Sequence, residues 1–315
     1  MAGFDIIAIG EPLFELNQAP GETVFRSGHG GDTSNAAIAA ARQGAKVGYV
    51  TAVGADQFGD SFLALWQGEG IDVSAVKRSP VAHTGLYFVN HGPSGHVFSY
   101  MRAGSAASRI TPEDMPVEAI HAAKVVHASG ISQAISSSAA DAVFHAMRTA
   151  RAAGVAVSYD TNLRLRLWPL DRARAVIHAA AGLSDILRPS IDDARQLTGL
   201  DDPDKIADFY LSVGPKVVAM TLGSEGALIA TKEKRERIAP RAAKLVDATG
   251  AGDTFTGAFL AEYLRTGDAF AAGRYANVAA ALSTEGYGAV APMPKRAAVE
   301  AAMMAGATHV SRGRH

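Results

Sequence analysis

The sequence predicts an α/β protein with a mainly parallel central sheet and a second, smaller sheet. Three observations lead to this fold class. Short apolar runs alternate with alanine-rich segments of helical length, which is the pattern of repeated strand-helix units. Two stretches of alternating apolar and polar residues interrupt that pattern, as hairpins do. With 48% hydrophobic and 19% charged residues, the chain has ample apolar material for a core.

The composition excludes several classes of protein. A chain of 315 residues with no cysteine has no disulfide scaffold, no thiolate nucleophile and no cysteine-bound zinc. Its 30 basic and 31 acidic residues leave a net charge of -1, so we expect neither a nucleic acid nor a membrane surface as partner. No stretch approaches the ~18 apolar residues of a membrane span, and the first residues do not resemble a signal peptide. We therefore expect a cytoplasmic protein.

Each element of the main sheet follows from the same alternation. The run FDIIAIG predicts a first strand over residues 4–10. A helix is predicted over residues 33–43, between the Gly30-Gly31 pair and Gly44. The elements that follow are strands near 46–51, 124–128, 155–160, 185–187 and 216–221, and helices near 58–67, 137–153, 172–181 and 192–197. The last third of the chain is predicted to be mainly helical.

Two hairpins stand between these units and define the predicted domain organisation. They cover residues 13–25 and 84–102, and the second turns at Gly92-Pro93-Ser94-Gly95. Strands inserted in this way predict a small sheet over the main one. We expect a large α/β domain that binds nucleotide and substrate, formed by residues 1–12, 28–83 and 103–310, and a discontinuous β lid formed by residues 13–27 and 84–102.

The segment Gly250-Ala251-Gly252-Asp253 precedes an apolar helical run and carries the strongest chemical signal. Residues with almost no side chain let the N–H groups at a helix start approach an anion closely. A carboxylate in the same first turn can take a proton from a hydroxyl that attacks a phosphoryl group. A capped helix with a tight glycine turn would give the same pattern, and the segment alone does not decide between the two.

Two signatures, in the expected order, resemble those of the PfkB, or ribokinase-like, family of carbohydrate kinases. The first comprises Gly30-Gly31-Asp32 and Asn35-Ala36-Ala37, followed by Val53-Gly54, Asp56, Gly59 and Gly70-Ile71. The second corresponds to residues 247–258, with Ala248 as a departure from the family pattern. The resemblance runs over nearly the whole chain. It implies a three-layer α/β/α fold with a β-sheet lid, ATP as co-substrate and Mg²⁺, and it leaves a monovalent cation open.

The resemblance also assigns roles to residues. It makes Asp253 the general base and the backbone amides of Gly250, Ala251 and Gly252 the anion hole. The implied nucleotide-binding residues are Ser190, Thr221, Gly223, Gly226 and Asn277. Asp193 takes the place of a family glutamate associated with magnesium and would act through water.

Three further segments indicate the acceptor. The run from Tyr100 to Ser108 resembles the Y-x-R-x-G-S-A motif of 2-keto-3-deoxygluconate kinases, and Asp160 to Trp168 resembles their D-x-N-x-R-x-x-L-W segment. Gly10-Glu11-Pro12 also matches their opening. The sugar site implied in this way comprises Gly31, Asn35, Tyr87, Tyr100, Arg102, Ile131 and Arg164. The two arginines suit a carboxylate, because a guanidinium binds it through two charge-assisted hydrogen bonds.

The function predicted from the sequence is ATP-dependent phosphorylation of 2-keto-3-deoxygluconate at its terminal hydroxyl, giving the 6-phosphate. The alternatives are a fructokinase or ribokinase acting on a neutral sugar, and a non-catalytic sugar or nucleotide sensor on the same fold. The gluconate and galactonate epimers are not distinguished. By resemblance, we expect the partners to be the sugar acid, ATP and further copies of the chain joined through the β lid.

Overall fold

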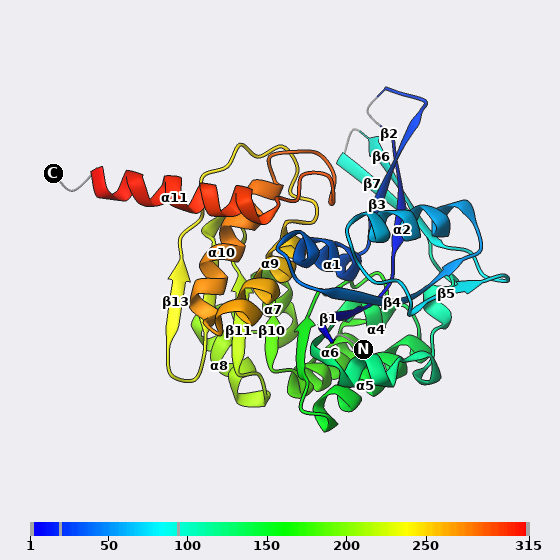
Figure 1. Cartoon of the computed structure of the whole chain (residues 1–315), viewed down its shortest axis with the longest axis horizontal. Helices are drawn as coiled ribbons and strands as arrows, with labels where there is room; N and C mark the ends of the chain where they lie inside the picture. The colour runs from blue at the N-terminus through cyan, green and yellow to red at the C-terminus, as the bar shows by residue number, and fades with distance from the viewer. Residues whose placement is uncertain (1–2, 19–20, 93–94, 313–315) are drawn as a thin grey trace.

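The chain, described here from a computed structural model covering residues 3–18, 21–92 and 95–312, is built around a nine-stranded sheet (Figure 1). In sheet order its strands are β13 (Arg235–Ile238), β12 (Ala227–Ala230), β11 (Val217–Thr221), β10 (Ile186–Arg188), β9 (Ala156–Asp160), β8 (Ala123–Ser129), β1 (Phe4–Ile9), β4 (Val47–Gly54) and β5 (Val76–Ser79). All neighbours are parallel except β11–β12 and β12–β13. The predicted mainly parallel sheet is confirmed.

Helices cover both faces of this sheet. One face carries α1 (Asp32–Arg42), α2 (Gln57–Gly68), α9 (Ala251–Thr266), α10 (Ala269–Ser283) and α11 (Arg296–Arg312). The other carries α3 (Val117–His121), α4 (Gly130–Ala134), α5 (Ser137–Ala152), α6 (Leu170–Leu183), α7 (Ile191–Thr198) and α8 (Pro203–Val213). Three short 3₁₀ turns are η1 (Ala107–Arg109), η2 (Pro112–Asp114) and η3 (Gly223–Glu225).

Side-chain alternation along β1 explains how one strand serves both layers. Ile6 and Ala8 pack into the cluster beneath α1 and α9, whereas Ile7 and Ile9 pack into the cluster beneath α5 and α6. Strands that are buried on both faces read as continuous apolar runs, as FDIIAI does. The α/β/α class therefore follows from the apolar strands and amphipathic helices together.

A second sheet of four strands stands at one end of the molecule (Figure 1). Its order is β3 (Phe25–Gly30), β2 (Leu13–Gln18), β6 (Gly85–Gly92) and β7 (Gly95–Met101), and we call it the lid sheet. β2 pairs antiparallel with β3 and parallel with β6, so the sheet is mixed. β6 and β7 form the predicted second hairpin, with Gly92 opposite Gly95. The other two predicted turn residues, Pro93 and Ser94, lie outside the described residues.

The boundary of the first hairpin was predicted wrongly. We expected it to end at Phe25, but Phe25 begins β3, which continues to Gly30. The sequence FRSGHG is rich in glycine and polar residues, and such residues have low intrinsic strand propensity. Pairing with β2 along its whole length holds β3 in place instead.

The sequence pattern also missed six elements, among them the five-residue helices α3 and α4. The edge strand β5 is only four residues long, and β12 and β13 form a hairpin in a region predicted to be mainly helical. Helix α8 was missed although Asp202 caps it and Pro203 opens it, which is a recognised start signal.

In the part of the chain that the structure describes, no helix is long and apolar enough to cross a membrane.

Candidate active site

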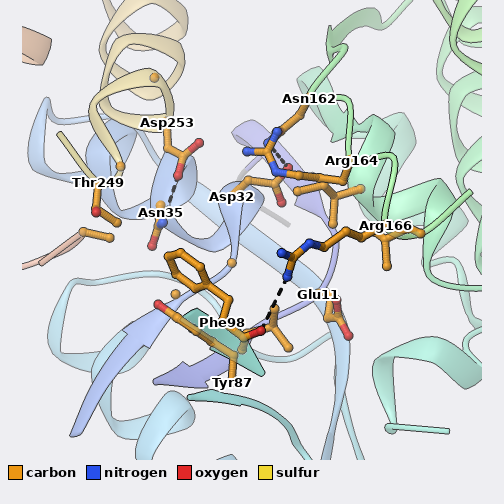
Figure 2. Close-up of a pocket in the computed structure, with 18 of the residues that line it drawn as sticks. Glu11, Asp32, Asn35, Tyr87, Phe98, Asn162, Arg164, Arg166, Thr249 and Asp253 are labelled. Atoms are coloured by element: carbon orange, nitrogen blue, oxygen red, sulfur yellow. Dashed lines mark hydrogen bonds between the residues drawn. The ribbon is translucent and has the colours of Figure 1, made fainter. Parts of the chain in front are cut away.

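A cavity of about 730 Å³ lies between the lid sheet and the carboxyl edge of the parallel strands (Figure 2). Open α/β sheets bind ligands at this edge, because the loops that leave the strands converge there. The cavity is lined by all seven predicted sugar-site residues and by five of the others: Gly31, Asn35, Tyr87, Tyr100, Arg102, Ile131 and Arg164, together with Ser190, Asp193, Gly250, Gly252 and Asp253.

Helix α9 brings the glycine-rich segment to the cavity wall. Gly250 precedes the helix with a φ of 75°, a left-handed conformation that glycine adopts without strain. Seven residues later, a Cβ at Gly257 would overlap the carbonyl oxygen of Ala36, so α9 lies directly against α1. The N–H groups of Gly252 and Asp253 stand in the first turn, where no earlier turn supplies an acceptor. This end of α9 can therefore receive an anion.

One predicted member of the anion hole is placed differently. Ala251 does not line the cavity, and its N–H donates to the carbonyl oxygen of Ala248 at 3.2 Å. The turn before α9 thus uses this amide internally. The remaining amides of the first turn stay available to a ligand.

Asp253 faces the cavity from the first turn of α9. Asn35 on α1 donates a hydrogen bond from Nδ2 to Asp253 Oδ2 at 2.9 Å (Figure 2). Shielding from water and then the nearby Asp32 carboxylate raise the pKa of Asp253 to about 7, while Asn35 and Arg188 act in the opposite direction. A carboxylate with a pKa near neutrality suits a general base.

A buried polar network connects α1 with strands β9 and β10. Asn162 Nδ2 donates to Asp32 Oδ2 at 2.7 Å, and Arg188 Nη1 donates to both carboxylate oxygens of Asp160 at 3.1 and 3.0 Å. Asn162 has a φ of 25°, a strained conformation held by its backbone N–H bond to Asp160. Burial raises the pKa of Asp160 to about 6 although Arg188 lowers it. These contacts fix the loop after β9.

Arg102 has a partner that the sequence did not suggest. Its guanidinium donates to the carboxylate of Glu11, which is fully buried at the end of β1. Burial raises the pKa of Glu11, whereas the charge of Arg102 lowers it. The pair brings the lid strand β7 to the edge of the main sheet. Because Glu11 balances its charge, Arg102 adds less positive potential to the cavity than the motif implies.

Two other arginines enter the cavity from the loop that follows β9. Arg164 and Arg166 are both exposed and line the cavity, and Figure 2 shows them extending toward its centre from the same side. Within the described ranges, neither has a carboxylate within 4.0 Å; Arg164 donates to the carbonyl of Leu163 and Arg166 to that of Phe98. Their charges therefore remain available to an anionic ligand.

Aromatic residues of the lid sheet form the opposite wall. Tyr87 and Tyr100 pair across β6 and β7, and their rings stack with centroids 6.0 Å apart. Phe98 lies beside them and also lines the cavity. The Tyr87 hydroxyl was expected to contact a ligand, but it donates a hydrogen bond to the carboxylate of Glu15. Cross-strand packing therefore accounts for part of the arrangement of these rings, and all three still line the cavity.

Ser190 and Asp193 stand at the start of α7. Ser190 caps the helix by accepting from the Asp193 N–H at 3.2 Å, and Asp193 Oδ2 accepts from the Leu163 N–H at 3.1 Å. Among the residues that the structure describes, no three potential ligand side chains cluster closely enough to hold a metal. A Mg²⁺ ion here would need phosphate oxygens and water to complete its octahedral shell.

Four predicted nucleotide-binding residues lie outside the cavity. Thr221 ends β11, Gly223 opens η3 and Gly226 closes it, so all three follow the same strand. Asn277 is on α10, and its Nδ2 donates to the carbonyl oxygen of Ala239. Gly226 and Asn277 both lie next to Ala239, at the end of the sheet beyond α9.

The sequence reasoning missed several lining residues. These are chiefly Glu11, Asp32, Phe98, Asn162, Arg166 and Arg188. Arg166 stood in the same motif as Arg164, separated by one residue, and that repeated spacing was the available signal. Arg188 follows an apolar strand and precedes a proline, and nothing local distinguishes it from a surface arginine.

The family model for "pfkB family carbohydrate kinase" matches residues 5–296. The chain belongs to this family. It is therefore a carbohydrate kinase, a phosphotransferase with an alcohol group as acceptor.

Curated relatives of this kinase include enzymes for two kinds of acceptor. The 2-dehydro-3-deoxygluconokinases of Thermoproteus tenax and Bacillus subtilis are 36% and 37% identical. Those alignments cover 84% of this chain and 83% of the relative in the first case, and 80% of both in the second. Fructokinase-2 of Solanum lycopersicum is 33% identical over 81% of this chain and 80% of its own length.

Solved structures show the same fold. The PfkB protein of Polaromonas sp. JS666 is 32% identical with a TM-score of 0.86, over 95% of this chain and all (100%) of that one. A putative ribokinase II from E. coli, in complex with ATP and Mg²⁺, is 25% identical with a TM-score of 0.88, over 96% and 99% of the two chains.

Proposed function

We propose that this kinase transfers the γ-phosphate of ATP to the terminal hydroxyl of 2-keto-3-deoxygluconate, giving the 6-phosphate. The observation that carries this choice of acceptor is the pair Arg164 and Arg166, which line the cavity without a carboxylate partner among the described residues. The relatives named 2-dehydro-3-deoxygluconokinase, at 36% and 37% identity, support the same choice.

The carboxylate of the substrate binds Arg164 and Arg166, in the loop that follows β9. Each charge-assisted hydrogen bond from a guanidinium to a carboxylate contributes roughly 1.5 to 3 kcal/mol. A neutral sugar would leave these charges to the solvent. The lid tyrosines and Phe98 then cover the carbon chain, and Ile131 on α4 adds an apolar contact.

The terminal hydroxyl lies at the α9 end. Asp253 takes its proton, and Asn35 fixes the orientation of that carboxylate. Asn35 Oδ1 is buried and has no hydrogen-bond partner among the described residues, so it is free to accept from a substrate hydroxyl. The first-turn amides of α9, including that of Gly252, receive the charge of the transferring phosphoryl group.

ATP occupies the far side of α9, along Thr221, Gly223, Gly226 and Asn277. The solved relative with ATP and Mg²⁺ supports this part of the proposal in general terms. Mg²⁺ would neutralise phosphate charge when bound. Ser190 and Asp193, at the start of α7, would hold its water ligands, since Asp193 lines the cavity and is oriented by the Leu163 N–H.

A neutral sugar is the second candidate acceptor, because Fructokinase-2 of Solanum lycopersicum is 33% identical. In that case Arg164 and Arg166 would serve the lid rather than the substrate. The bond from Arg166 to the carbonyl oxygen of Phe98 on β7 shows that such a contact is available.

The lid sheet has a second proposed role as the contact between copies of the chain. Its exposed apolar side chains away from the cavity include Phe25, Val97 and Met101, with 38%, 54% and 55% of their surface accessible. Burying such a patch in a dimer would remove apolar surface from water. Sedimentation of the parent and of Met101→Glu tests this: a parent that is monomeric at micromolar concentration rejects it.

ADP release across a panel of acceptors tests the proposed reaction. The panel comprises 2-keto-3-deoxygluconate, its galactonate epimer, gluconate, fructose, ribose and adenosine. We expect the highest kcat/KM with a 2-keto-3-deoxy sugar acid. A preference for fructose or ribose would reject the acid assignment and leave the kinase assignment intact.

A further inference from the structure

We propose that Arg188 is a further catalytic residue of this kinase, whose guanidinium contacts the transferring phosphoryl group beside the N-terminus of α9 and stabilises its charge. The inference rests on the proposed use of that helix end by the phosphoryl group. It is independent of which sugar accepts the phosphate.

Arg188 is nearly buried but still reaches the cavity. It is the last residue of β10, and only 8% of its surface is accessible. The cavity nevertheless includes it among its lining residues, together with Gly252 and Asp253. The small accessible part of Arg188 therefore opens toward the proposed reaction site.

One side of the guanidinium has no partner. Nη1 alone bonds to Asp160, at 3.1 and 3.0 Å from its two carboxylate oxygens. Nε is buried with no hydrogen-bond partner in the described part of the chain, and Nη2 donates no hydrogen bond there either. An arginine that served only to balance Asp160 would be expected to use two nitrogens in a parallel pair. Nε and Nη2 of Arg188 can therefore donate hydrogen bonds to a ligand.

The unused nitrogen lies against the start of α9. A Cβ added to Gly252 would overlap Nη2 of Arg188. Glycine at position 252 thus makes room for the guanidinium as well as for an anion at the helix N-terminus. A phosphoryl oxygen held by the first-turn amides would lie next to this donor.

Several carboxylates surround the position of Arg188, and a cation there offsets their negative charge. Burial lowers the pKa of Arg188, but Asp160, Asp253 and Asp193 together raise it above its ordinary value. Asp32 adds a further carboxylate beside Asp253. Without Arg188, these acids would repel the phosphate charge that must approach them. A guanidinium stays protonated throughout, so it can stabilise charge without exchanging a proton.

The reaction step is then balanced as follows. The acceptor hydroxyl gives its proton to Asp253, its oxygen forms a bond to the γ-phosphorus, and the bond from that phosphorus to the β–γ bridging oxygen breaks. ADP leaves with the bond's electron pair. Arg188 donates hydrogen bonds to equatorial phosphoryl oxygens, whose interaction with cations dominates phosphoryl-transfer catalysis.

The test compares a neutral replacement of the ion pair with a variant that keeps the guanidinium. The double variant Arg188→Met with Asp160→Asn leaves no unpaired buried charge, and such replacements of buried pairs usually fold. Asp160→Asn alone is the matched control, because it retains Arg188. Steady-state kinetics with the acceptor that the parent uses best gives kcat and both KM values, and circular dichroism checks the fold.

We expect the double variant to lose roughly 10²- to 10³-fold in kcat relative to Asp160→Asn, with both KM values within about threefold. Arg188→Lys keeps a charge for Asp160 but lacks the second nitrogen, and we expect a kcat at least roughly tenfold below the parent. Relative to Asp160→Asn, the inflection of the pH–rate profile moves to higher pH in the double variant, because Arg188 no longer favours ionised Asp253.

A folded double variant with kcat within threefold of Asp160→Asn overturns the proposal. If the double variant does not fold, Arg188→Lys decides alone, and a kcat within threefold of the parent rejects the role. Asp253→Asn is measured in parallel. Its inactivity beside an active Arg188 variant would reject only this inference, whereas a parent inactive on every acceptor would reject the proposed function.

Discussion

At one end of the cavity, Asp253 and its neighbours are tied together by hydrogen bonds, whereas Arg164 and Arg166 at the other end are exposed and make only main-chain contacts. The tied end has fixed geometry and carboxylates whose pKa values rise toward neutrality. The open end has two exposed guanidinium groups on long side chains that are free to adapt. We infer from this comparison that the chemistry belongs to the buried end and the choice of substrate to the exposed end.

The largest expected effect is at the buried end. Asp253→Asn removes the proposed base but keeps its shape, so we expect kcat to fall roughly 10³-fold with little change in the KM values. ADP release at saturating substrates measures it. Asp141→Asn, an exposed position on α5, is the control and retains parental turnover. Near-normal turnover of Asp253→Asn would remove the base assignment.

The open end should respond in KM instead. Arg164→Ala removes one carboxylate contact, and we expect the KM for the sugar acid to rise roughly 10- to 100-fold while the KM for ATP stays within twofold. Arg172→Ala on α6, an exposed arginine away from the cavity, serves as the control. Equal changes in both KM values, or a loss confined to kcat, would erase the contrast between the two ends.

The pH dependence of turnover should report only the buried end. With its pKa near 7, Asp253 is mostly protonated at pH 6 and mostly ionised at pH 8. We expect kcat/KM for the sugar acid to rise about tenfold over that interval and then to level off. A flat profile from pH 5 to 8 would contradict the raised pKa.

The smallest expected effect is on stability. Asp253→Asn should lower activity but raise the stability of the fold. A carboxyl whose pKa is raised in the folded state stabilises the fold only while it is protonated, so stability falls as pH rises from the unfolded value near 4 to about 7. Asp253→Asn avoids this loss. We expect its melting temperature to exceed that of the parent by a few degrees at pH 8, and by less at pH 5.

The control for this comparison is Arg164→Ala, whose melting temperature should match the parent at both pH values, because its side chain is exposed. A parent that is more stable than Asp253→Asn at pH 8 would show that ionised Asp253 is compensated in the fold. The charged groups at the two ends of the cavity would then not differ in how much they destabilise the fold.

Much of the fold could be predicted because it depends on patterns that are local in sequence. The apolar run of β1, the glycine turn before α9 and the hairpin of β6 and β7 were all found in this way. Strand β3 was misplaced because its glycines and polar residues form a strand only when β2 is beside them. The edge strand β5 is too short to leave a clear pattern.

The candidate site also has features that local motifs predict and features that only tertiary contacts decide. The chain itself carries the arginines after β9, the Asp253 beside its glycines and the lid tyrosines, because each belongs to a short motif with an evident chemical use. Which charges are available was decided by tertiary structure. Arg102 meets Glu11 across 91 positions of sequence, and Asn35 meets Asp253 across 218.

By itself, then, the sequence determined the α/β architecture, the kinase chemistry and the residue types on offer, since periodicity and motif spacing act over short distances. Tertiary structure decided that Arg102 pairs with Glu11, that Arg166 has no carboxylate partner among the described residues, and that Arg188 lies against Gly252 with Nε and Nη2 unbonded there. The physical reason is that pairing, burial and pKa depend on what the fold brings within a few ångströms, and the strand order of a parallel sheet joins residues that no local pattern connects.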